Sequence, residues 1–460
     1  MAQKQKIFPF TSYESPVELT VETINEKGQG IAHFEEYEIY LDGVIDGEVV
    51  LASIGDPFAN GSKRRPGTIV EFIKKSKDRA DNSLELTQGG IYAYGNLTYE
   101  ASLSRKQDKI KEALALAGVK KIEPLDIVKS NLNEPSRFKT VRFFGCENDS
   151  IINGFYKARS HEIIAVSKSD LEPEWFSSFA NALCQMFTKE NVSVYDEFER
   201  VGILRSLLLR DTQGGKLAVL VVADELGDSL KSNYLKIAKD FNIDAVFVNV
   251  NKTTGNKIVD GECVALTDTK SITLNLCDFE FKAGPNTFLQ VNYPVASALY
   301  QKAVDWCGND KAGSALDLCC GVGTMTLCLA KNFNKVTGVD IVSESIDAAK
   351  ENAVLNNITN AQFVAEDLKE SISALVEDKS LKAVICDPAR AGIGQEACEA
   401  LAKSTGNINL AYIFCSLTSL SRDVKTLTSL GFKVKSVQGF DMFPYTAHVE
   451  TVVLMSRVEK

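Results

Sequence analysis

The spacing of hydrophobic and polar residues changes twice along the chain and divides it into three parts. Over residues 17–75 apolar and polar positions alternate in short runs, interrupted by glycine-containing turns at 27–30, 42–43 and 46–47. This pattern predicts about five strands joined by tight turns. Closed on themselves, the strands would form a small OB-like barrel, a common scaffold for oligonucleotides, and we assign residues 1–75 to it. A β-domain with a purely structural role is the alternative.

The middle of the chain contains both strand-like alternation and the wider spacing of apolar residues that is typical of helices. Residues 99–118 carry apolar positions at helical spacing and end at Gly118, as helices often do. Between 136 and 275, apolar strand-like runs surround an amphipathic helix at 174–189. We therefore predict a central mixed α/β domain over 76–275, with the helix near 99–118 packed on the domain that follows.

From residue 314 strands and helices alternate regularly. The expected strands are 314–320, 335–340, 361–367, 382–388 and 410–416, followed by two strands, 432–443 and 448–456, without a helix between them. Alternating strands and helices predict a parallel, doubly wound sheet, and the final pair predicts an antiparallel edge. Residues 276–460 are thus expected to form a Rossmann-like domain, which makes the protein α/β overall.

Composition narrows the class of protein. The 460 residues, 45% hydrophobic and 24% charged, are typical of a folded chain with several domains. No apolar run approaches the roughly 20 residues that span a bilayer, and no secretory signal begins the chain. The 11 cysteines form no CxxC pair, and only 3 histidines are present. We expect a cytoplasmic protein with reduced thiols, no metal site and no membrane association.

Charge is distributed unevenly. The net charge is −10, but residues 57–160 contain 19 Lys and Arg against 12 Asp and Glu. Lysine and arginine that contact phosphates release counterions and so favour nucleic-acid binding. Lys63, Arg64 and Arg65 are therefore candidate RNA contacts, with an ordinary solvated surface as the alternative.

The first turn of the Rossmann-like domain has the features of a nucleoside site. Gly321 and Gly323 follow the strand that contains Asp317, and Asp340 ends the next strand. Glycine permits a tight turn and close backbone approach, and an acidic residue at this spacing reaches a ribose. The third glycine of the dinucleotide pattern is missing, so no pyrophosphate cradle is evident. S-adenosylmethionine is therefore a better ligand than NAD.

Four further segments resemble one family. They are 288–304, 386–394, the strand end at Cys415, and 440–455. In this order they resemble the RNA uracil-5-methyltransferases, S-adenosylmethionine-dependent enzymes that form 5-methyluridine. The N-terminal barrel resembles that family's TRAM domain, so the likeness covers most of the chain.

The resemblance implies two catalytic roles. Carbon 5 of uracil is a weak nucleophile until a thiolate adds to carbon 6, and the methylated adduct must then lose its carbon 5 proton to a base. The target base has to leave its stack to reach such a site. Cys415 matches the family's nucleophile and Glu450 its base, whereas His448 is expected to be structural.

The resemblance also implies which residues contact the cofactor and the RNA. Asp387 corresponds to an aspartate near the cofactor and the uracil edge, and Arg390 to its companion on the RNA side. Gln290 matches a cofactor contact, and Asp367 is expected to face adenine. The implied cofactor set is Gln290, Cys319 through its backbone, Gly321, Gly323, Asp340, Asp367 and Asp387.

The chain also departs from the family. Ala389 replaces a proline, Cys319 replaces an aromatic residue, and Ser416-Leu417 stands where Asn-Pro is common. Cysteines that hold an iron–sulfur cluster in some members are missing, so no cluster is expected. The implied partner is tRNA or large-subunit rRNA, bound by a monomer.

Three other functions remain open at this stage. An RNA cytosine-5-methyltransferase also uses a cysteine, but its Pro-Cys motif is missing here. An RNA-binding protein that lost its activity would not need Cys415 and Glu450. A nucleotide-binding oxidoreductase is disfavoured by the incomplete glycine pattern.

Overall fold

The computed structural model describes residues 15–59, 61–81, 87, 90–157, 160–255, 257–404 and 406–457. The chain divides into two compact units. The first comprises 1–105, 157–161 and 444–447, and the second comprises 106–156, 162–443 and 448–460. Residues 1–14, part of the predicted barrel domain, lie outside the described residues. The domain boundaries at 75 and 275 stay a prediction.

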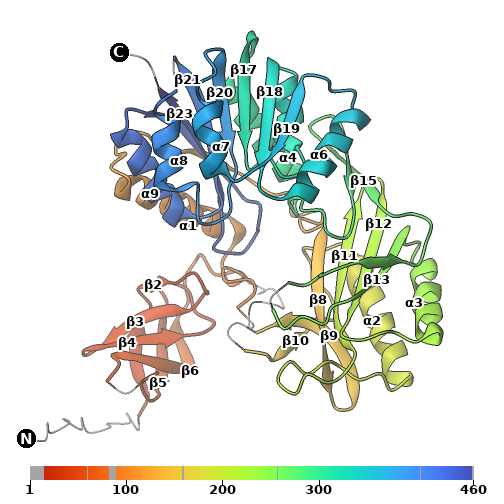
Figure 1. The fold of residues 1–460 in the computed structure, drawn as a ribbon. Coiled ribbons are helices and arrows are strands. Elements are labelled where there is room, and N and C mark those ends of the chain that lie inside the picture. Colours follow the sequence, from red (N-terminus) through yellow and green to blue (C-terminus); the bar gives the residue numbers. More distant parts are fainter. Residues whose placement is uncertain are drawn as a thin grey trace, which may run out of the picture. The chain divides into compact units, whose positions relative to one another are not determined.

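The first unit contains a curled six-stranded sheet, drawn from red to orange in Figure 1, in the order β1-β5-β6-β4-β3-β2. Its strands are β1 (Val17–Thr20), β2 (Thr23–Ile24), β3 (Gly30–Phe34), β4 (Tyr37–Leu41), β5 (Val49–Ile54) and β6 (Arg64–Lys74). The long β6 pairs with β5 and with β4. Alternate residues such as Leu19, Ile39 and Val50 fill the interior. The strand-rich, barrel-like start predicted from the sequence is confirmed.

The second unit contains two large sheets. The first has seven strands in the order β10-β9-β8-β11-β12-β13-β14. These strands are β8 (Lys139–Glu147), β9 (Ser150–Tyr156), β10 (Ile163–Ala165), β11 (Leu204–Thr212), β12 (Gly215–Val222), β13 (Ala245–Val250) and β14 (Cys263–Ala265). Helices α2 (Glu174–Lys189) and α3 (Asp228–Asp240) bury residues such as Phe179 and Tyr234 against one face. The opposite face, with Leu208 and Phe247, packs with the hairpin β15 (Ile272–Leu276) and β16 (Phe279–Ala283).

The second sheet has eight strands in the order β19-β18-β17-β20-β21-β23-β22-β7. They are β7 (Leu125–Val128), β17 (Asp310–Leu318), β18 (Phe333–Asp340), β19 (Ala361–Ala365), β20 (Leu381–Cys386), β21 (Ile408–Phe414), β22 (Lys433–Phe440) and β23 (Glu450–Arg457). Strands β17 to β21 run parallel, and β23 is antiparallel to both neighbours. The predicted doubly wound sheet with an antiparallel edge is confirmed.

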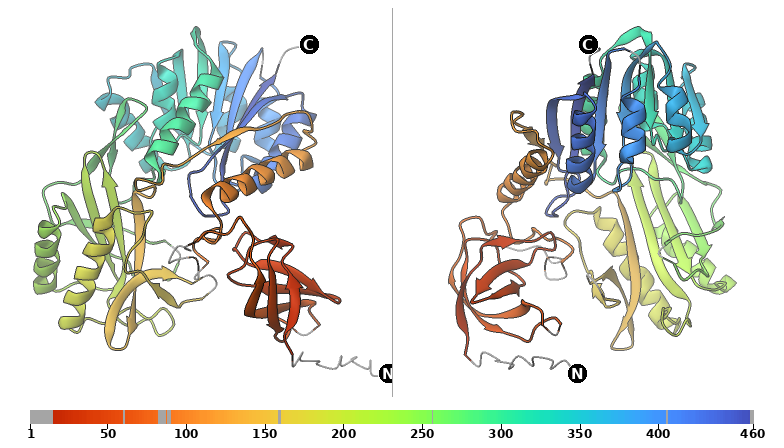
Figure 2. Two further views of the ribbon diagram at one scale, coloured as in Figure 1. Left: turned by 180° about the vertical axis from the view of Figure 1, so that it is seen from behind. Right: turned by 60° about the vertical axis from the view of Figure 1, so that its left-hand side comes forward.

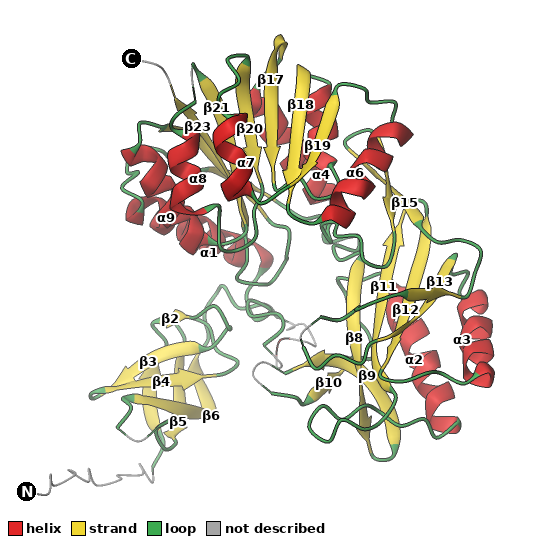
Figure 3. Ribbon diagram, in the orientation of Figure 1, coloured by secondary structure: helices red, strands yellow, loops and turns green. Residues whose placement is uncertain are grey.

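Helices cover both faces of this sheet (Figures 2 and 3). They are α4 (Tyr293–Cys307), α5 (Thr324–Ala330), α6 (Ser343–Leu355), α7 (Leu368–Leu375), α8 (Gly394–Leu401) and α9 (Leu417–Ser429). The sequence indicated neither the short helix α7 nor the edge strand β7. Among the described residues, none of the helices combines the length and apolarity that a membrane span requires.

A buried ionic network fixes the end of β22. Lys106, from the helix α1 (Tyr99–Leu116), and Asp441 form an ion pair in which both side chains are fully buried. Lys106 Nζ also donates to the carbonyl oxygen of Phe443 (2.9 Å), and Ser130 Oγ donates to that of Asp441 (2.6 Å). Burial lowers the pKa of Lys106, while Asp441 opposes this effect. The pair thus anchors the chain just before Phe443.

We expect Lys106→Met to destabilise the protein by about 3–5 kcal/mol, because it leaves the Asp441 carboxylate buried without its cation. The measurement is urea unfolding followed by circular dichroism. The double variant Lys106→Met, Asp441→Asn should recover part of the loss.

Lys111 on the same helix provides the control. It pairs with Glu123, and both side chains are exposed. Lys111→Met should change stability by no more than about 0.5 kcal/mol. Equal effects of the two lysine substitutions would contradict the role given to the buried pair.

Candidate active site

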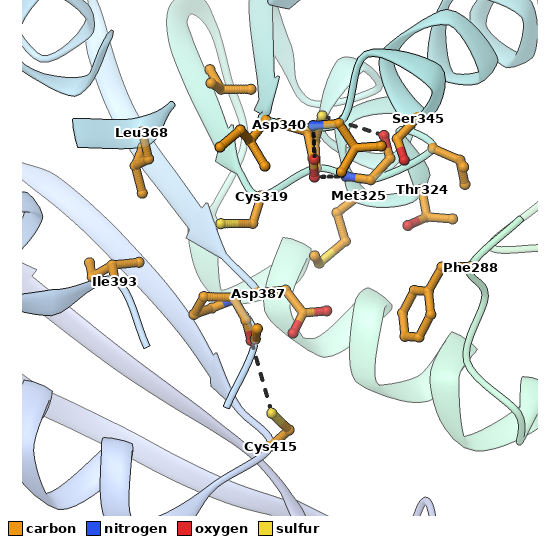
Figure 4. A pocket seen from close by; sticks show the side chains of 18 of the residues that line it. Phe288, Cys319, Thr324, Met325, Asp340, Ser345, Leu368, Asp387, Ile393 and Cys415 are labelled. Carbon is orange, nitrogen blue, oxygen red and sulfur yellow. Dashed lines mark hydrogen bonds between the residues drawn. The ribbon is translucent and has the colours of Figure 1, made fainter. Parts of the chain in front are cut away.

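A cavity of about 680 Å³ opens at the carboxyl ends of β17, β18, β20 and β21 (Figure 4). This is the edge at which parallel α/β sheets bind ligands. Its walls come from the segment before α4, the turns after these strands, and the start of β23. Most of the residues singled out from the sequence line it: Gln290, Cys319, Gly321, Asp340, Asp367, Asp387, Arg390, Cys415 and Glu450.

The glycine turn after β17 adopts the strained backbone that its sequence suggests. Cys319, Gly321 and Gly323 all have positive φ, at 64°, 53° and 84°. A Cβ on Gly323 would lie 3.1 Å from side-chain atoms of Ala349 and Phe363. Gly323 therefore serves conformation and packing, and it does not itself line the cavity. The Cys319 side chain does line it, beyond the backbone contact expected from the sequence.

The carboxylate of Asp340 secures this turn. Its Oδ2 accepts a hydrogen bond from the Gly321 N–H (2.9 Å), and its Oδ1 accepts one from the Val342 N–H (2.9 Å). Both oxygens retain further lone pairs that face the cavity edge. Asp367 caps α7 by accepting from the Lys369 N–H (2.9 Å). The two acids thus hold loops as well as offering acceptors to a ligand.

The other end of the cavity brings a thiol close to two carboxyl groups, the buried Glu450 and the partly buried Asp387. Cys415 follows β21, and its Sγ donates to the carbonyl oxygen of Pro388 (3.9 Å), as the dashed line in Figure 4 shows. Glu450, at the start of β23, is only 3% exposed. Its Oε2 is buried without a hydrogen-bond partner among the described residues. A lone carboxyl group in this position is costly, which indicates a functional role.

The carboxyl groups interact strongly. Burial, then the charge of Asp387, raises the pKa of Glu450 to about 8, against an opposing effect of Arg390. Burial, then Asp317, raises the pKa of Asp387 to about 7. Burial, then Glu450 and Asp387, raises the pKa of Cys415 to about 11. The site therefore favours protons on its own groups at neutral pH and would be stabilised by a positively charged ligand.

Some lining residues were not found from the sequence. Phe443 and His448 line the cavity with their rings 6.3 Å apart at a steep angle, although His448 was expected to be structural. Phe288, which is 72% exposed, and the buried Tyr300 line it from the α4 side. All four lie inside the segments 288–304 and 440–455 that carry the family resemblance, and this position was the available signal.

The candidate RNA contacts of the first unit differ in exposure. Arg65 is 4% exposed, and its guanidinium lies 4.2 Å from the centre of the Tyr37 ring. Lys63 and Arg64 are exposed and pair with Glu36 and Glu38. Arg65 thus has a packing role, and RNA contact by all three stays a prediction.

Within the described residues, no group of three or more His, Cys, Asp or Glu side chains is arranged to hold a metal ion. Part of the segment that lacks the cluster cysteines lies outside those residues. The expectation of no iron–sulfur cluster stays a prediction.

Comparison with known proteins agrees with these features. Residues 98–458 match the family described as tRNA (uracil-5-)-methyltransferase. An uncharacterized RNA methyltransferase of Clostridium tetani is 31% identical over 450 residues, covering 96% of both chains. A second, from Clostridium acetobutylicum, is 29% identical and covers 99% of this chain and 100% of that one.

A solved structure has the same fold. It is that of Pyrococcus abyssi tRNA (uracil-54, C5)-methyltransferase in complex with S-adenosyl-L-homocysteine. It matches with a TM-score of 0.74 and 22% identity over 95% of this chain and 99% of that chain. The family, fold class, enzyme class and methyl donor predicted from the sequence are confirmed. The chain belongs to the tRNA (uracil-5-)-methyltransferase family and is an S-adenosylmethionine-dependent RNA (uracil-5-)-methyltransferase.

Proposed function

We propose that the protein methylates carbon 5 of a specific uridine in tRNA or large-subunit rRNA through a covalent adduct between Cys415 and carbon 6 of the base. The observation that carries the proposal is the single cavity shared by the thiol, the buried Glu450 and the Asp340 turn. This supports the proposal, because the residues proposed as nucleophile, base and cofactor contacts line the same cavity. We further propose that the enzyme acts as a cytoplasmic monomer.

The cavity fits S-adenosylmethionine, which supplies the methyl group. Asp340 would hold the ribose hydroxyls, and Gln290 and the backbone around Cys319 and Gly321 would hold the amino-acid part. Asp367 lies beside the apolar residues Val342 and Leu368, where an adenine ring would fit. A sulfonium cation suits a cavity whose carboxyl groups, Asp387 and Glu450, repel one another.

The residues act in sequence on the base. Cys415 releases its thiol proton to solvent, and the thiolate adds to carbon 6, so that carbon 5 becomes nucleophilic. Carbon 5 would then take the methyl group from the donor's sulfur, which would leave as the neutral thioether S-adenosyl-L-homocysteine. The Glu450 carboxylate then accepts the carbon 5 proton, and the carbon 6–sulfur bond breaks to release the thiolate. With a pKa near 8, Glu450 is able to hold and release a proton close to neutral pH. Asp387 and Arg390 are proposed to orient the uracil edge.

The target is identified by mapping 5-methyluridine and 5-methylcytidine in RNA from cells with and without the gene. Loss of 5-methyluridine at one or more positions supports the proposal and names the RNA. Loss of 5-methylcytidine would favour the cytosine-5-methyltransferase, and no loss would favour an RNA-binding protein without activity.

Asp340→Ala should weaken S-adenosylmethionine binding by about one to two decades, since it removes a charge-assisted hydrogen bond of roughly 1.5–3 kcal/mol. Calorimetry measures the affinity. Asp347→Ala, an exposed change on α6, is the matched control and should bind normally. Equal affinities of the two variants would refute the ribose assignment.

Glu450→Gln should make Cys415 more reactive, because removal of the carboxylate lowers the pKa of the thiol. Each unit by which that pKa falls raises the thiolate fraction about tenfold. The measurement is the rate of iodoacetamide modification at pH 9, followed by peptide mass spectrometry. Exposed Cys146 serves as the internal reference and should react at an unchanged rate. Slower modification of Cys415 would contradict the coupling.

Assays on unmodified RNA should distinguish the role of Cys415 from that of Glu450. Glu450→Gln should accumulate a methylated, covalent protein–RNA species, because loss of a general base costs about 10²–10⁴-fold at the step that resolves it. Cys415→Ala should form none. Denaturing electrophoresis detects the species, and 5-fluorouridine RNA should trap the unchanged enzyme in the same way.

Cys386 offers the matched cysteine control. It is fully buried in β20, and burial raises its thiol pKa well above the ordinary value. Cys386→Ala should still be trapped by 5-fluorouridine RNA. A covalent complex formed by Cys415→Ala would show that another cysteine is the nucleophile.

A further inference from the structure

Two cationic side chains of the central sheet, and a third just before its strand β8, lie close together. Lys139, the first residue of β8, stands directly opposite Arg210 of the antiparallel strand β11. Directly opposed residues in an antiparallel pair share a face, and like charges there destabilise the sheet. Burial, then the charges of Arg210 and Arg137, lowers the pKa of Lys139 to about 8, which is consistent with the strand pairing.

No carboxylate among the described residues pairs with any of the three. Arg210 is fully buried, and only its Nη2 has a partner, the carbonyl oxygen of Thr287. Its Nε and Nη1, and the Nε of Arg137, are buried without a hydrogen-bond partner. The buried Arg142 of β8 also leaves its Nε and Nη1 without a hydrogen-bond partner, but its charge is paired with Glu172. An uncompensated cluster of this kind lowers stability, so an anionic ligand would explain it.

The cluster adjoins the catalytic cavity. Arg210 contacts Thr287, the residue before Phe288, and the Phe138 N–H donates to the carbonyl oxygen of Val291 (2.8 Å). The Phe138 ring also stacks on Tyr293, with centroids 5.1 Å apart. The segment held between these contacts contains Phe288, Leu289 and Gln290, all of which line the cavity. Arg137 and Lys139, on either side of Phe138, therefore belong to a segment that contacts the cavity wall.

We propose that Arg137 and Lys139 bind a phosphodiester of the RNA strand next to the target uridine, with the charge of Arg210 behind them. This assignment rests on the proposed function. Both side chains are partly exposed, so that a backbone phosphate can reach them. Phosphate contacts fix the register of the strand, which a nucleotide displaced from its stack requires. The carboxylate of the cofactor is the other anion available here, and the experiment separates the two.

The test compares the unchanged protein with Arg137→Met, Lys139→Met. The probe is a fluorescein-labelled 12-nucleotide oligouridylate, titrated between 50 and 300 mM salt. The double variant should bind it about 10- to 100-fold more weakly at 50 mM salt. The slope of log affinity against log salt should fall by about 1.4, which is two contacts at about 0.7 each. S-adenosylmethionine affinity should be unchanged, and the Tm should rise because like charges are removed.

Lys236→Met, Lys239→Met is the matched control. Both lysines are exposed on α3, which covers the opposite face of the same sheet. The control removes the same charge and should keep the salt slope and the Tm. Lys139→Gln is a second, milder variant. It removes one of the two proposed contacts, so its salt slope should fall by about half as much as that of the double variant.

Three outcomes would overturn the assignment. Weakened cofactor binding with retained RNA binding would assign the cluster to the cofactor carboxylate. A salt slope of the double variant equal to that of the control variant would show that Arg137 and Lys139 do not contact a phosphate. A lower Tm in both cluster variants would show that Arg137 and Lys139 stabilise the fold. Formation of 5-methyluridine by the unchanged protein is measured separately, so that failure of the proposed function is recognised independently of the salt slope.

Discussion

Confinement of several carboxyl groups away from water and close to one another is the constraint on which the site depends. Burial, then Asp317, raises the pKa of Asp387, and burial, then Asp387, raises that of Glu450. Glu450 has a folded-state pKa near 8 against an ordinary 4.5, so the folded site keeps a proton that the unfolded chain releases. Stability contributed here therefore falls as pH rises from about 4.5 to about 8. A cationic ligand would offset that loss, which links cofactor binding to the protonation of the base.

Buried contacts from distant segments hold these groups in place. Asp317 accepts a hydrogen bond from Thr326 (2.6 Å), which ties β17 to α5 below the glycine turn. At the other end, Lys106 and Ser130 hold Asp441, and Asn292 donates to Ser130 Oγ (2.8 Å). Asn292 follows Gln290 by two residues, and Asp441 precedes Phe443 by two. The same network thus positions both the cofactor side and the base side of the cavity.

The spacing of apolar residues along the chain predicted the parallel strands and therefore the edge of the sheet at which the cavity lies. Parallel strands deliver their last residues to one edge, where a ligand site was expected beside Asp340. The roles of Asp387 and Cys415 came from the family resemblance, and all three residues line one cavity. Glu450 was singled out by the same resemblance, as the match to the family's base. Strand β7 and helix α7 were missed because four and eight residues carry too little periodicity. The Lys106–Asp441 pair was invisible, since its partners are 335 residues apart.

The basic residues show most clearly what a sequence leaves open. Lys63, Arg64 and Arg65 form the densest basic triplet in the barrel, yet Arg65 is buried under Tyr37 and the other two have acidic partners. Arg137 and Lys139 are two residues apart, but Arg210 is far from them in the sequence, and only strand pairing brings it face to face with Lys139. Charge density along a sequence measures attraction to a polyanion at long range. The phosphate contacts themselves depend on which cations the fold leaves without a counter-charge, and that is decided by sheet register and burial.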